Sequence, residues 1–148
     1  MSANLIDAVF TVLSDDPALL ALLGLNPSSS DDHLVARLHR GIEPHKPITE
    51  KTAPQICMYV KPGRFGRNHL VFEGKFCLDF YGKTSYQVKQ LFERSFALFH
   101  DDNIQAAGFH SFRCTLAYDA DMATGITGIK GYTAMFDVDY IRTNPDRR

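Results

Sequence analysis

The segment from residue 70 to residue 99 constrains the fold most, because a strand pattern is followed at once by a helix pattern. Between Leu70 and Tyr81 the side chains alternate between two faces, and four of these twelve residues are aromatic. Alternation with a period of two predicts a strand that buries one face. Gly82 is expected to end this strand.

An amphipathic helix is predicted directly after this strand. Thr84 and, three residues later, Gln87 form a capping box, in which each side chain can bind a free backbone N–H at the start of a helix. Apolar residues then recur at helical spacing from Val88 to Phe99, while charged and amide side chains fill the other side. We expect the phenylalanine-rich faces of the strand and the helix to pack together.

The N-terminal region predicts two short helices. Residues 3–13 carry apolar side chains at helical spacing. Asp16 caps a new helix and Pro17 fits its first turn. Gly24 is suited to end that helix in the left-handed conformation.

Further strands are expected after these helices. Residues 55–61 and 70–81 should form a hairpin across a turn-rich connection. Alternation predicts a third strand over 112–118 and a fourth over 132–141, and a short strand over 35–39 is conceivable. The segments expected to be irregular are residues 26–32, 41–54, 62–68, 100–103 and 119–128, and a polar tail from about residue 143.

These elements predict one α+β domain over residues 1–148. Its sheet is expected to be antiparallel, with about four strands and with helices packed on one face. The helices would be the two short N-terminal ones and one long central helix.

Composition narrows the class of protein. The formal net charge of −1 over 148 residues argues against a general nucleic-acid binder, which needs an excess of Lys and Arg. No apolar run approaches the ~20 residues of a membrane span, and no signal-peptide pattern opens the chain. Cys57, Cys77 and Cys114 lie in predicted strands, so we expect buried, free thiols and a reducing compartment.

No motif for catalysis or metal binding is complete. A calcium loop starting at Asp119 would need Gly and Glu where the chain has Thr124 and Lys130. The six histidines, His45 among them, show no paired ligand spacing. We therefore expect no enzyme, no cofactor and no metal, although residues assembled only in space remain an alternative.

A basic cluster marks the predicted hairpin tip, and acidic residues gather elsewhere. The cluster consists of Lys61, Arg64, Phe65, Arg67 and His69. Asp119 and Asp121 form one of several acidic groups. Unlike patches can meet on neighbouring copies, so these residues are candidates for a subunit or ring interface. A solvated turn or a contact with nucleic acid would also account for the tip.

Four phrases in their order suggest a family. They are DPALLALLG, PQICMYV, FCLDFYGKTSYQVKQLFERSFALF and YTAMFDVDYI. This layout, over about residues 3–142, resembles the tail-completion or tail-terminator (head–tail joining) proteins of long-tailed bacteriophages.

The resemblance implies a non-enzymatic virion protein that is assembled in the host cytoplasm. Copies of it would form a homo-oligomeric ring with six subunits. Such a ring caps the tail tube protein, ends its polymerisation and joins it to the head connector or head-closure protein. DNA passes through the lumen without sequence-specific binding, and no membrane or cofactor is involved. By position, residues 61–69 and 119–130 would be the loops that reach neighbouring rings.

Three alternatives remain at this point. One is a neck or head-closure protein on the portal side. Another is an unrelated small α+β enzyme or ligand-binding domain, and a third is a cellular adaptor module.

Overall fold

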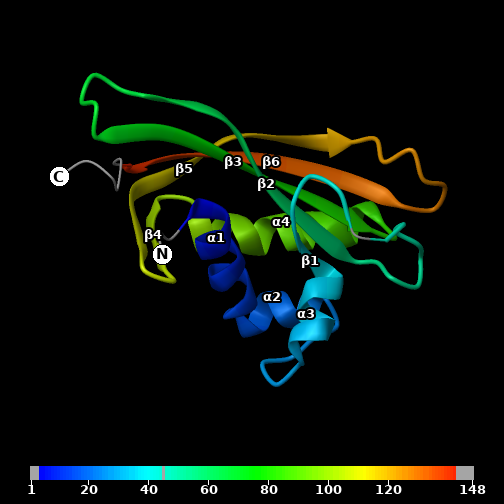
Figure 1. The fold of residues 1–148 in the computed structure, drawn as a ribbon. Coiled ribbons are helices and arrows are strands. Elements are labelled where there is room, and N and C mark those ends of the chain that lie inside the picture. Colours follow the sequence, from blue (N-terminus) through cyan, green and yellow to red (C-terminus); the bar gives the residue numbers. More distant parts are fainter. Residues whose placement is uncertain (1–3, 45, 143–148) are drawn as a thin grey trace.

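A computed structural model describes residues 4–44 and 46–142. His45 and the polar tail expected from about residue 143 lie outside the described residues. Figure 1 shows a twisted sheet with helices against one of its faces. The strands are β1 (Leu38–Arg40), β2 (Gln55–Phe65), β3 (Val71–Gly82), β4 (Asp102–Ala106), β5 (Phe109–Met122) and β6 (Lys130–Ile141). The helices are α1 (Leu5–Ser14), α2 (Pro17–Leu22), α3 (Asp31–Arg37) and α4 (Ser85–Phe99).

The sheet is mixed and has the strand order β1-β2-β3-β6-β5-β4. β1 runs parallel to β2, and every other neighbouring pair is antiparallel. The sheet curves into a half-barrel. None of the helices in the described part of the chain is long and apolar enough to cross a membrane.

The expected fold class was wrong. The expectation was an antiparallel sheet of about four strands with two short N-terminal helices and one long central helix. The described residues instead form six strands in a mixed half-barrel with four small helices. β4 occupies part of a segment expected to be a loop. Residues 35–37 belong to α3, so the short strand considered over residues 35–39 begins only at Leu38.

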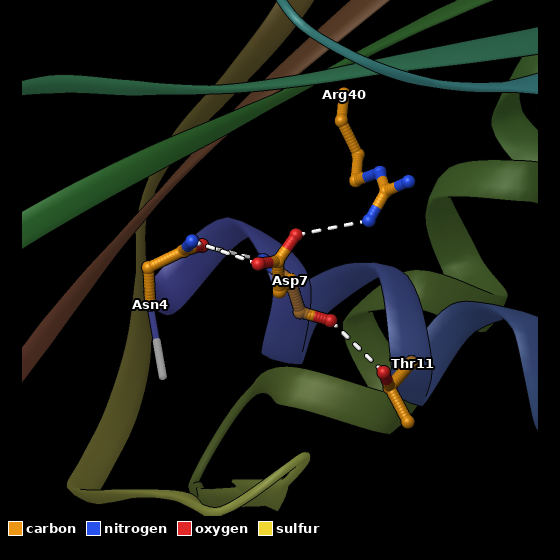
Figure 2. Close-up of polar contacts among 4 residues, drawn as sticks. All are labelled: Asn4, Asp7, Thr11 and Arg40. Atoms are coloured by element: carbon orange, nitrogen blue, oxygen red, sulfur yellow. Dashed lines mark hydrogen bonds and ion pairs between the residues drawn. The ribbon is translucent and has the colours of Figure 1, made fainter. Parts of the chain in front are cut away.

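The parallel strand β1 depends on contacts that are distant in sequence. Arg40 at its end donates to the Asp7 carboxylate of α1 at 2.9 Å, and its guanidinium lies 4.5 Å from the centre of the Phe10 ring. Figure 2 shows Asp7 between this arginine and the N-cap residue Asn4, whose Oδ1 accepts from the Asp7 N–H. Thr11 donates to the backbone carbonyl of Asp7. β1 thus contacts α1 through side chains that no local pattern reveals, and its ladder partner β2 is equally distant in sequence.

Phenylalanine rings join the sheet to α4. Phe76 of β3 lies 5.3 Å from Phe99 of α4 and 5.1 Å from Phe136 of β6, measured between ring centroids. All three side chains are fully buried. Burial of such rings is the largest favourable contribution available to a domain of this size. The predicted packing of the strand face on the helix face is confirmed.

The predicted helix ends are confirmed as well. The Thr84 hydroxyl accepts from the Gln87 N–H, and the Gln87 side chain accepts from the Lys83 N–H. At the end of α2, Gly24 has φ +76°. The Leu25 N–H then donates to the Leu20 carbonyl at 2.7 Å, as in a Schellman cap.

Asp16 connects the corner between α1 and α2 to α4. Its carboxylate accepts from the Leu19 N–H at 2.9 Å and from two guanidinium nitrogens of Arg94, both at 2.7 Å. The hydrogen bonds from Arg94 lower the pKa of the Asp16 carboxyl below its usual 3.8. The charged form is therefore favoured in the folded protein.

We predict that Asp16→Asn lowers the free energy of unfolding by about 1–2 kcal/mol at pH 7, because the charge-assisted bonds to Arg94 are lost while an oxygen remains for the helix cap. Since the folded pKa is the lower one, this contribution is present above pH 3.8 and is lost as the pH falls through the folded pKa. Urea unfolding from pH 7 to pH 3 measures the difference between variant and wild type.

Asp15→Asn is the matched control, because Asp15 is exposed and lies one residue away. It should change stability by less than about 0.5 kcal/mol. An equal effect of the two substitutions, or a difference that stays constant down to pH 3, would contradict the assigned role.

Candidate subunit interface

Two hairpins extend beyond the helices at opposite ends of the sheet (Figure 1). We call residues 60–73 the basic arm and residues 117–131 the acidic arm. β6 runs from one arm to the other: Gly131 near its start pairs with Met122, and Ile141 at its end pairs with Val71. Residues 60–65 and 117–121 are all exposed. These two stretches of strand are thus exposed at opposite ends of the sheet.

The basic arm is a longer strand pair than expected. Residues 62–65 were expected to be a turn, but β2 continues to Phe65 through a bulge between Lys61 and Arg64. Pro62 lies where β2 has no further described strand beside it, so the missing N–H of proline costs no ladder bond. Gly63 is required in the bulge because a Cβ there would lie 2.5 Å from the backbone oxygen of Glu73.

The predicted basic side chains all lie on this arm. Arg64 Nε lies 3.1 Å from Glu73 Oε1, but the two side chains are 85% and 44% exposed, so this pair contributes little to stability. Arg67 is exposed in the turn, and Lys61 lies over the Tyr59 ring at 5.6 Å. The arm therefore offers its positive charge to solvent.

Asp119 and Asp121 lie at the other end of the sheet, on the acidic arm. Asp119 accepts a hydrogen bond from the Tyr132 hydroxyl, which raises the pKa of that phenol to about 12. Asp121 is exposed. The structure does not bring these carboxylates near the basic arm of the same copy. Their role in an interface stays a prediction.

A groove lies on the helix-facing side of the basic arm, and sequence analysis did not predict it. It has a volume of about 830 Å³ and lies between the start of α1 and the turn from β4 to β5. Its floor carries a row of rings, in which Tyr140 lies 5.6 Å from Phe72 and 5.0 Å from Phe109. The Arg142 guanidinium lies 4.6 Å from the centre of the Phe72 ring. The alternating pattern assigned Phe72 and Tyr140 to one face of their strands. It did not show where the helices stop covering that face.

The opposite, outer face holds a satisfied polar group beside Cys57, whereas Cys114 lies in the main core. The buried Asp79 carboxylate accepts from the hydroxyls of Tyr59 at 3.0 Å and Thr133 at 2.7 Å. Burial raises the pKa of the Cys57 and Cys114 thiols to about 12. They are therefore protonated at neutral pH and poor nucleophiles. The predicted burial of all three cysteines is confirmed.

Comparisons with known proteins find a similar fold but no similar sequence. The sequence matches no family model and no curated protein. A solved structure described as "Virion of native gene transfer agent (GTA) particle" contains a similar chain, with a TM-score of 0.66 and 10% sequence identity. The match covers 93% of this chain and 95% of that chain. At this identity the similarity shows a shared fold.

We predict that Gly63→Ala lowers the free energy of unfolding by about 1–3 kcal/mol, because the added methyl group meets backbone that cannot move without shifting the bulge. Gly41→Ala is the control, since a Cβ there has no atom within 4 Å, and its effect should lie within about 0.5 kcal/mol of zero. Chemical denaturation measures both. Equal stability of the two variants would mean that the bulge adapts freely.

Proposed function

We propose that this chain is a structural protein of a phage-like virion, in which it forms a ring that caps the tail tube, ends its polymerisation and joins it to the head connector. The observation that carries the proposal is the shared fold with a chain of a gene transfer agent particle over nearly the full length of both chains. The resemblance of the sequence to tail terminators supports the specific place at the end of the tail.

The distribution of charge supports assembly into a ring. Lys61, Arg64 and Arg67 lie at one end of the sheet, and Asp119 and Asp121 lie at the other. A contact between unlike ends is heterologous, so a pair of copies keeps one free end of each kind to which further copies can add. Repeated contacts of this kind form a closed ring when the rotation from one copy to the next divides a full turn evenly.

Passage of DNA through such a ring fits the total charge. The formal net charge is −1, so a ring of these copies would have little general attraction for the phosphate backbone. The partners under this proposal are further copies of the chain, the tail tube protein and the head connector or head-closure protein.

We predict that Arg64→Glu/Arg67→Glu leaves the chain folded and abolishes the ring, because both side chains are exposed and their reversed charge repels the acidic arm of a neighbour. Light scattering coupled to gel filtration measures the mass, negative-stain images show the ring, and circular dichroism tests the fold.

Lys46→Glu/Arg113→Glu is the control with the same change in net charge, on exposed residues outside both arms. This control should assemble as the wild type does. A wild-type protein that stays monomeric at every concentration and never adds to tail tubes would refute the proposed function. Binding to tail-free heads instead of tubes would place the chain on the portal side.

A further inference from the structure

We infer that the acidic arm of one copy docks into the groove under the basic arm of the next copy. This inference rests on the proposed ring and names the contact that would hold it together. It is carried by the chemistry of the groove, by that of the acidic arm and by their places in the fold.

The groove offers apolar surface with cations at its rim. Val60 and Ile141 are 56% and 55% exposed, although both belong to strands of the sheet. The row of aromatic rings forms the floor, and His110 and Arg142 contribute to the lining. None of the described residues that line the groove is acidic. The groove therefore suits a segment that carries both apolar side chains and carboxylates.

The acidic arm has this composition. Tyr118 and Ile126 are 48% and 37% exposed, and Asp119 and Asp121 lie beside them on the same hairpin. The arm is exposed over residues 117–121, so it can enter a groove without unfolding. Its apolar side chains can cover Val60, while its carboxylates meet Arg142.

An acidic arm that enters the groove has to come from a second copy, because the acidic arm and the groove of one chain lie at opposite ends of β6. Extension of the sheet from the open edge of β2 is a poorer contact. Pro62 has no N–H to donate there, and the bulge between Lys61 and Arg64 breaks the regular ladder. Docking by side chains in the groove needs neither a backbone N–H at residue 62 nor a regular strand ladder.

The first test buries a charge in the contact. Val60→Asp should weaken self-association at least tenfold, measured by analytical ultracentrifugation of the full chain, because an unpaired carboxylate would be desolvated against the neighbour. Ile42→Asp is the control, since Ile42 is 62% exposed and lies outside the groove. A Val60→Asp ring as stable as the wild-type ring would refute the groove contact while the proposed function stands.

The second test exchanges charges between groove and arm, and it does not depend on the stability of one variant. Arg142→Glu and Asp121→Lys should each weaken the ring, and a chain carrying both should regain most of the wild-type association. Rescue supports a contact between copies. Loss without rescue would show that something other than the neighbour's acidic arm occupies the groove, which overturns the inference. A wild-type chain without any ring would instead refute the proposed function.

Discussion

The packing of α4 against the sheet limits how much of the sheet is covered. A helix of 15 residues is about 22 Å long, whereas the 12 residues of β3 and the 14 of β5 span about 40 and 46 Å. Phe99, the last residue of α4, packs on Phe76 in the middle of the strands, and Phe92 packs on Phe80 and Tyr132, so α4 covers the half of the sheet toward the acidic arm. The end of the sheet that carries the basic arm therefore lies beyond α4, and the two ends of the sheet carry opposite charge.

Local patterns in the sequence predicted the elements that local physics determines. Thr84 and Gln87 marked the start of α4, and Asp16 with Gly24 marked both ends of α2. Alternation located the strands that bury one face and predicted their packing on α4. These features depend on residues only a few positions apart, so one sequence is enough to predict them.

The remaining features depend on contacts that are distant in sequence. β1 has three residues, pairs with β2 and contacts α1 through Arg40. Pro62 and Gly63 suggest a turn, yet an open edge and a bulge let β2 continue through them. The charged residues of the candidate interface were predicted as two groups. Their separation by the length of the sheet was not predicted, because it follows from the order and register of the strands. The groove under the basic arm was not predicted either, because it follows from where the helices stop.

The central claim is that unlike ends of the sheet meet between copies. Cryo-electron microscopy of the assembled protein tests it most directly, since a reconstruction shows which surfaces touch. The account predicts a closed ring in which residues 60–73 of each copy contact residues 117–131 of the next. A two-fold dimer that joins equal ends, or a ring that leaves both ends free, would contradict it.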